Sequence, residues 1–163
     1  MPQPTGYTRA QIALHWITVV LVALQFLLHD AMSEAWDAIE EGREVIFNPL
    51  ISQHVFMGAL VAIVTFIRLG LRLSHGAPPP PASEHAALQL VAHATHWAFY
   101  VLLILVPVFG AVAWFNAVDL AAEAHEMLTS VLLALIALHV LAALVHQFIF
   151  KTNLLARMKN PAP

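Results

Sequence analysis

Histidines are the residues of this sequence best suited to chemistry. The chain has ten of them and no cysteine, so disulfides, thiolate-ligated iron–sulfur clusters, c-type haem attachment and a catalytic thiol are excluded. His125 and His139 are fourteen residues apart within one predicted span, at about 123–150. On a helix this spacing places them about 21 Å apart along the axis and on nearly the same face. It suits two cofactors stacked along a bundle.

The proposed cofactor is b-type haem, which has no covalent tether and takes axial ligands from opposite sides of its ring. Two facing helices can each supply one imidazole. We therefore predict that His15 and His139 ligate the iron of an inner haem, and that His54 and His125 ligate an outer one. For any single histidine, a hydrogen-bonded core role is the default interpretation, but this is a poor explanation for four together.

Four long uncharged runs must position these histidines. Each run holds at least about 20 residues, enough to cross the hydrocarbon core of a bilayer as a helix. The composition is 60% hydrophobic and only 10% charged, with a mean hydropathy of +0.77, which excludes an ordinary soluble domain. We predict an all-α fold, an integral membrane four-helix bundle forming a single domain over residues 1–163, with spans at about 10–30, 48–70, 86–114 and 123–150. A short amphipathic helix is expected around 33–41.

Charge is distributed unevenly between the two sides of the predicted membrane. Six of the seven basic residues fall on one side, namely Arg9, Arg68, Arg72, Lys151, Arg157 and Lys159. This side should be cytoplasmic, with both termini inside. Nine of the ten acidic residues fall on the other, outer side, and only Glu84 falls on the inner side. A multi-pass protein of the bacterial inner membrane with a strongly acidic outer face is expected.

Three cations near the inner haem could hold its propionates. Arg68, Arg72 and Lys151 lie on the inner side, and carboxylates at a haem edge need cationic partners. The alternative is that these residues serve only to orient the protein in the membrane.

His93 and His96 are neighbours on one helix surface, three residues apart. They could hydrogen-bond the haem propionates or form part of a proton path. A metal site is disfavoured because no carboxylate lies nearby on the segment.

Several segments together resemble the bacterial cytochrome b561 family. These are the opening Tyr7–Trp16 (YTRAQIALHW), His54 with Gly58, the basic Arg68/Arg72 end, Ala92-His93-x2-His96, and Leu138-His139-x6-His146 followed by Lys151 and Arg157. The resemblance covers nearly the whole chain. It implies a four-helix di-haem cytochrome with bis-histidine ligation that exchanges electrons with quinone. The implied relatives include the membrane cytochrome b subunits of formate dehydrogenases and nickel–iron hydrogenases.

His146 has two interpretations. Its depth below the inner charged residues would suit a haem ligand, but the spacing of His139 from His125 resembles the ligand pair of the family. His146 lies seven residues beyond His139, about 10 Å further along almost the same face. We predict that it approaches a quinone and donates a proton to it. Interfacial hydrogen bonding is the alternative.

The function expected is membrane electron transfer between two b haems and the quinone pool, as an electron carrier more than as an enzyme. Superoxide is a proposed outer donor in the resembling family, but an acidic outer face repels a small anion and better suits a cationic redox protein. No nucleic-acid partner is expected. The alternatives are a haem-bearing anchor subunit of a separate dehydrogenase and, less favoured, a histidine-based proton or metal transporter.

Overall fold

The computed structural model describes residues 4–80 and 84–161, which are helical apart from short connections. The helices are α1 (Arg9–Leu27), α2 (Asp30–Glu40), α3 (Pro49–His75), α4 (Ala86–Asn116), α5 (Asp119–Phe148) and α6 (Leu154–Arg157). Four of them, α1, α3, α4 and α5, are 19 to 31 residues long and apolar enough to cross a membrane. The prediction of an all-α protein with four long apolar helices is confirmed.

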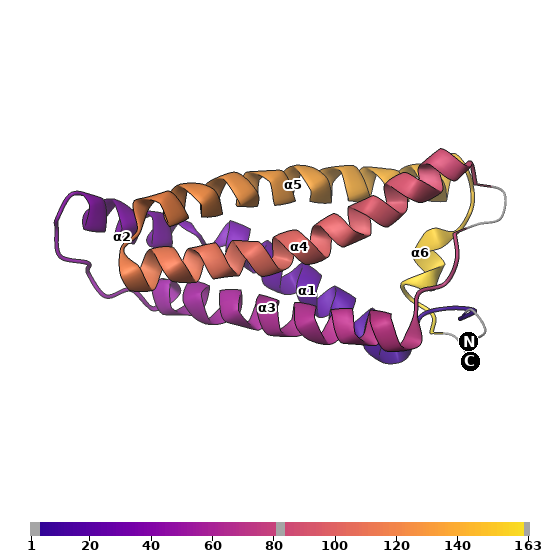
Figure 1. The fold of residues 1–163 in the computed structure, drawn as a ribbon, viewed down its shortest axis with the longest axis horizontal. Helices are drawn as coiled ribbons and strands as arrows, with labels where there is room; N and C mark the ends of the chain where they lie inside the picture. Colours follow the sequence, from indigo (N-terminus) through magenta and orange to yellow (C-terminus); the bar gives the residue numbers. More distant parts are fainter. Residues whose placement is uncertain (1–3, 81–83, 162–163) are drawn as a thin grey trace.

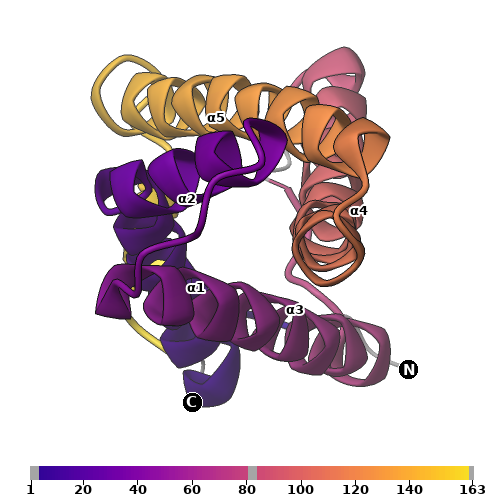
Figure 2. The same cartoon turned by 90° about the vertical axis from the view of Figure 1, so that its left-hand side faces the viewer.

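The long helices run lengthwise in one bundle (Figure 1). Both termini and α6 lie at one end, which we call the terminal end, while α2 and the α4–α5 connection lie at the other, the α2 end (Figure 1). Packing follows the order α1–α3–α4–α5, with α2 against α3 and α6 against α5. Viewed from the α2 end, the long helices surround a common axis, and α3 and α5 face one another across it (Figure 2).

Local capping fixes where the helices begin and end. Thr8 caps α1 through a reciprocal pair of hydrogen bonds with Gln11, which satisfies two otherwise free backbone N–H groups. The Gln11 side chain also donates to the carbonyl oxygen of Gly76 at 3.0 Å, and Gly76 ends α3 with a φ of 75°. The start of α1 and the end of α3 are therefore joined at the terminal end.

The buried core is small and lies midway along the bundle. It consists of Leu21, Val61, Val64, Leu102, Leu103 and Leu132. Leu132 is seven residues from both His125 and His139. Most other large apolar side chains are exposed, as expected where hydrocarbon replaces water around the helices. An apolar layer thus separates the histidines of the two ends.

The predicted short amphipathic helix is α2. Its buried face is Ala31, Ala35 and Ala38, with Ile51 and Trp114 packed in the same cluster. Its acidic residues, Asp30, Glu34, Asp37 and Glu40, are exposed. The first residues of α5, which carry Asp119, Glu123 and Glu126, lie at the same end (Figure 1). Glu41 and Glu44 follow α2 in the connection to α3, so nine carboxylates are gathered at the α2 end.

Candidate haem centres

His54 and His125 meet across the bundle near the α2 end. His54 comes from α3 and His125 from α5, and their ring centroids are 6.4 Å apart with an angle of 66° between the planes. Two imidazoles bound to one metal from opposite sides have ring centres roughly 6 Å apart, because each nitrogen lies about 2 Å from the metal and the ring adds about 1 Å. The predicted outer pair is therefore brought together at a separation that fits bis-histidine ligation.

The ring of His125 is oriented by the helix beside it. Its Nδ1 donates a hydrogen bond to the carbonyl oxygen of Val106 at 2.8 Å, next to Pro107 within α4. This leaves Nε2 with its lone pair free for a metal, which is the usual arrangement of a ligating histidine. A Cβ atom at Gly110 would lie 2.8 Å from Nδ1 and 2.9 Å from Cε1 of this ring. Only glycine lets the imidazole lie so close to α4.

His54 has a polar atom that requires a partner. Its Nδ1 is buried and forms no hydrogen bond within the described part of the chain, an arrangement that costs free energy unless a ligand satisfies the group. The backbone beneath it is held by Gln25, whose Nε2 donates to the carbonyl oxygen of His54 at 2.9 Å. The same Nε2 would lie 3.4 Å from a Cβ at Gly58, an ordinary van der Waals distance, so this contact does not require a glycine there.

Gly110→Ala is expected to weaken haem binding at the α2 end by about 10-fold or more, the range found when the orientation of a metal ligand is disturbed. The added methyl group would displace the His125 ring and break its bond to Val106. The haem content per chain after purification, measured as the pyridine haemochrome, would report the loss. Gly70→Ala is the matched control, because no atom lies within 4 Å of a Cβ at that position. Full haem content in Gly110→Ala would contradict the assignment.

A second group of histidines lies nearer the terminal end. His139 of α5 has its ring centroid 5.8 Å from that of His96 in α4 and 5.3 Å from that of Phe99. His15 of α1 contacts Trp16 and Arg68, and within the described residues its ring makes no ring contact with His96 or His139. Within residues 4–80 and 84–161 the three do not form a three-ligand metal site. His139 thus lies beside His96, whose Nδ1 bonds to the carbonyl oxygen of Ala92 in its own helix, and the pairing of His15 with His139 stays a prediction.

Arg68 anchors this second group. Its guanidinium donates to the Thr18 hydroxyl at 3.0 Å and to Nδ1 of His15 at 3.2 Å. Because Nδ1 accepts here, the ring proton is on Nε2, whereas ligation through Nε2 needs the proton on Nδ1. Ligation of a metal through Nε2 of His15 would therefore require Arg68 to release the ring.

The other two predicted cations are placed differently. Arg72 has its guanidinium carbon 5.8 Å from the ring centre of Trp97 and 6.0 Å from that of Tyr100. Lys151 is exposed just beyond α5, and in the described part of the chain it forms no hydrogen bond or ion pair with the histidine group. The structure thus brings Arg68, but not Lys151, into contact with a predicted ligand.

His93 accepts a hydrogen bond from Trp97 at 3.0 Å.

His146 has both ring nitrogens engaged near the end of α5. Its Nε2 lies 3.0 Å from Oε1 of Glu84, and its Nδ1 lies 3.1 Å from the hydroxyl oxygen of Thr152. It also borders a groove of about 310 Å³. The remaining lining residues are apolar, namely Leu88, Leu138, Leu141, Ala142, Val145 and Phe150. His146 is the polar group of an otherwise apolar groove between α4 and α5.

Comparison with known proteins decides the family. Residues 6–161 match the family described as "Prokaryotic cytochrome b561". The chain belongs to this family. It is therefore a haem-binding membrane cytochrome, and the resemblance noted from its sequence is confirmed.

Three relatives of this cytochrome extend over almost its whole length. "Cytochrome b562" of Cereibacter sphaeroides is 33% identical, with 99% of each chain covered. "Probable superoxide oxidase CybB" of Yersinia pestis is 26% identical over 93% of this chain and 94% of its own. "Cytochrome b561 homolog 1" of Escherichia coli is 28% identical over 93% of this chain and 96% of its own.

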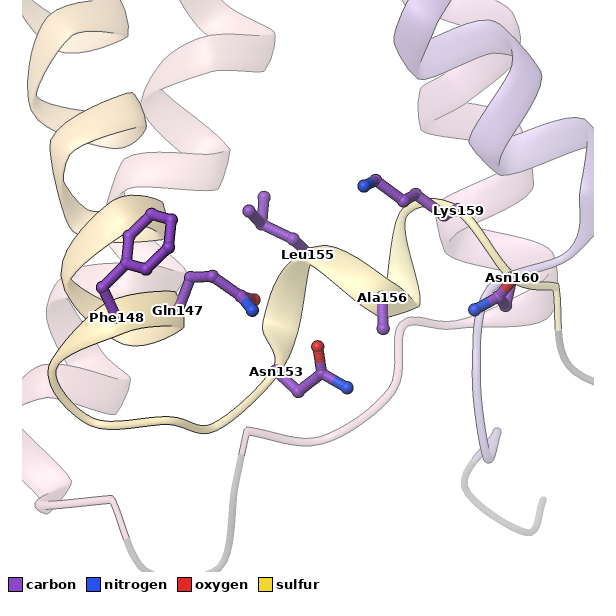
Figure 3. Close-up of a pocket in the computed structure, with 7 residues that line it drawn as sticks. All are labelled: Gln147, Phe148, Asn153, Leu155, Ala156, Lys159 and Asn160. Atoms are coloured by element: carbon purple, nitrogen blue, oxygen red, sulfur yellow. The ribbon is translucent and has the colours of Figure 1, made fainter.

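The terminal end of the cytochrome also has a pocket of about 310 Å³ beneath α5, lined by Gln147, Phe148, Asn153, Leu155, Ala156, Lys159 and Asn160. Figure 3 shows the side chains of Leu155 and Lys159 on the same side of α6. The indole N–H of Trp16 in α1 donates to the carbonyl oxygen of Met158 at 2.9 Å, so the α6 segment reaches from α5 to α1. Lys159 is thereby placed near the helices that carry His15 and His139, which the sequence did not indicate.

Tyr7 lies at the same end, ahead of α1. Burial raises the pKa of its phenol, although the nearby Arg72 and Arg157 act in the opposite direction. The phenol is therefore protonated at neutral pH and available as a hydrogen-bond donor.

Proposed function

We propose that this cytochrome carries electrons through the membrane between two b haems and the quinone pool. The observation that carries the proposal is the meeting of His54 and His125 from helices on opposite sides of the bundle, 6.4 Å apart between ring centroids. A second set of histidines lies beyond the apolar core layer. Two ligand sets at different depths are what a route for electrons across a bilayer requires.

In this proposal His54 and His125 hold the haem at the α2 end, and His15 and His139 hold the one at the terminal end. When bound, each haem supplies an iron that is reversibly reduced by one electron. The chain fixes the imidazoles: Val106 orients His125, and Arg68 would hold a propionate at the terminal end once it released His15. Arg72 and Lys159 are further candidates for propionates, and Lys151 is a weaker one because it is exposed beyond α5.

The terminal end is proposed to face the cytoplasm of a bacterial cell, across its inner membrane. It carries six of the seven basic residues of the chain, and basic residues are retained on the cytoplasmic side. On this basis the haem of His15 and His139 is the inner one, and the acidic α2 end is the outer face.

The groove beside His146 is the proposed site of the quinone. Its apolar lining and its position between the outer surfaces of α4 and α5 suit a lipid-soluble ring. A quinone carbonyl must gain a proton as electrons arrive, and an imidazole can deliver one near neutral pH. His146 is the group at the groove that can do so.

The outer redox partner is proposed to be a cationic protein. The nine carboxylates gathered at the α2 end attract a basic surface and increase its encounter rate. The Yersinia pestis relative is named a probable superoxide oxidase, but superoxide is an anion that this acidic end repels. The rate of haem reduction by cationic and anionic donors at low and high ionic strength would separate the two.

The haem content of the parent protein tests the proposal directly. Two b haems per chain are expected from the pyridine haemochrome of the purified protein. Both should be reduced by a quinol and reoxidised by a quinone in proteoliposomes. A well-folded protein with one haem, or with two that do not exchange electrons with quinone, would overturn it. Stoichiometric co-purification with a soluble dehydrogenase would instead support the anchor-subunit alternative.

A further inference from the structure

Glu84 is the one acidic residue outside the α2 end of the molecule. It lies just before α4, and its side chain is only 8% exposed. A carboxylate removed from water costs free energy unless it is paired. Its partner is His146, with 3.0 Å between Oε1 and Nε2 and only 15% of the imidazole exposed. This is a buried acid–base pair beside the groove.

The hydrogen bonds around His146 leave one proton free to move. The Thr152 hydroxyl donates to the carbonyl oxygen of His146, so it accepts from the Nδ1–H of the same ring. Nδ1 is therefore held as a donor. The remaining proton of the pair is shared between Nε2 and the Glu84 carboxylate, and it can lie on either.

Glu84 also lies next to an exposed residue at the terminal end. The next residue, His85, is exposed and caps α4. The backbone of Glu84 is held in place, because Nε2 of Gln89 donates to its carbonyl oxygen at 2.9 Å. The carboxylate thus stays beside His146, one residue from the exposed side chain of His85.

We propose that Glu84 is the proton-exchange partner of His146, passing protons between the water at the terminal end and the quinone site. The proposal rests on the proposed role of His146. Reduction of one quinone takes two electrons, which arrive singly from the terminal-end haem, and two protons. For each proton, the Nε2–H bond of the His146 imidazolium breaks as an O–H bond forms on a quinone oxygen, while Nδ1 keeps its proton. The Glu84 carboxylate then takes a proton from water and passes it to Nε2, which restores the imidazolium. Quinol oxidation runs these steps in reverse.

Glu84→Gln tests the exchange, since glutamine keeps the size and a hydrogen bond to His146 but carries no exchangeable acid proton. We expect kcat for quinone-linked turnover to fall about 10- to 100-fold, in the range of an acid–base contribution. The KM for quinone and the content of both haems should stay near the parent values. Glu84→Asp should recover part of the rate, and added acetate should accelerate Glu84→Ala.

His85→Asn is the matched control. It removes the exposed imidazole next to Glu84 but keeps a residue that can cap α4 and leaves the Glu84–His146 pair intact, so kcat close to the parent value is expected. If kcat in Glu84→Gln equals the parent value, or if neither aspartate nor acetate restores the rate, the proton-exchange role is wrong. His146→Gln separates this from a failure of the quinone site. If kcat for quinone-linked turnover falls in His146→Gln but not in Glu84→Gln, the exchange role alone is refuted. If kcat in His146→Gln equals the parent value, the proposed quinone site is refuted.

Discussion

Replacing His54 or His125 by alanine is expected to reduce the haem content from two per chain to one. Each variant removes one of the two imidazoles that approach to 6.4 Å, and a haem without a covalent tether depends on both. Substitution of His15 or His139 should remove the other haem instead. The pyridine haemochrome gives the number that remains, and the redox titration shows which of two potentials has disappeared.

The two sets of variants should be independent of one another. The apolar layer of Leu21, Val61, Leu102 and Leu132 separates them, and effects at distant sites without shared partners are close to additive. His93→Ala is the control, because His93 is exposed and bonds to Trp97. Loss of both haems in every ligand variant would indicate general unfolding, and two haems in His54→Ala or His125→Ala would refute the outer pair.

The elements of this fold follow from simple sequence patterns. Four uncharged runs long enough to cross a bilayer become α1, α3, α4 and α5, because a backbone in hydrocarbon must satisfy its own hydrogen bonds. The spacing of His125 and His139 is a property of a single helix, so it could be predicted without tertiary information. The pairing of His54 with His125 followed from their common depth in the membrane, and the structure brings the two rings together.

The remaining features of the site depend on contacts that no local pattern encodes. His96 is one of two histidines three residues apart, and only the rotation of α4 decides that its ring, and not that of His93, faces His139. The meeting of Glu84 with His146 joins residues sixty-two positions apart. In the sequence, Glu84 stands out only as the one acidic residue predicted on the inner side of the membrane. That pattern does not indicate a role for it.

The position of Lys159 has a similar origin. Lys151 and Asn153 adopt positive φ angles of 54° and 53°, which non-glycine residues rarely do, and the chain turns there toward α1. This turn places α6 beneath the bundle, where the Trp16 indole bonds to Met158. If the chain instead continued outward along the axis of α5, Lys159 would lie far from the helices that carry His15 and His139.

His146→Gln is expected to slow quinone-linked turnover by about 100-fold or more while both haems remain, because a positioned acid–base group contributes about 10²- to 10⁴-fold. Glutamine can still bond to Glu84, so the buried carboxylate keeps a partner and the end of α5 should stay folded. Turnover with quinone in proteoliposomes gives the rate, and reduction of the haems by a donor from the α2 end, which does not involve the groove, provides the internal control.

The same variant also decides between His139 and His146 as the inner ligand. In the structure both nitrogens of His146 are engaged, by Glu84 and Thr152, whereas the ring of His139 lies in the group with His96. A ligand must offer a free lone pair, so haem should be lost in His139→Ala and kept in His146→Gln. The opposite result would make His146 the ligand. It would also leave the quinone site without its proton donor, since one imidazole cannot both hold iron through Nε2 and exchange a proton with Glu84 at that nitrogen.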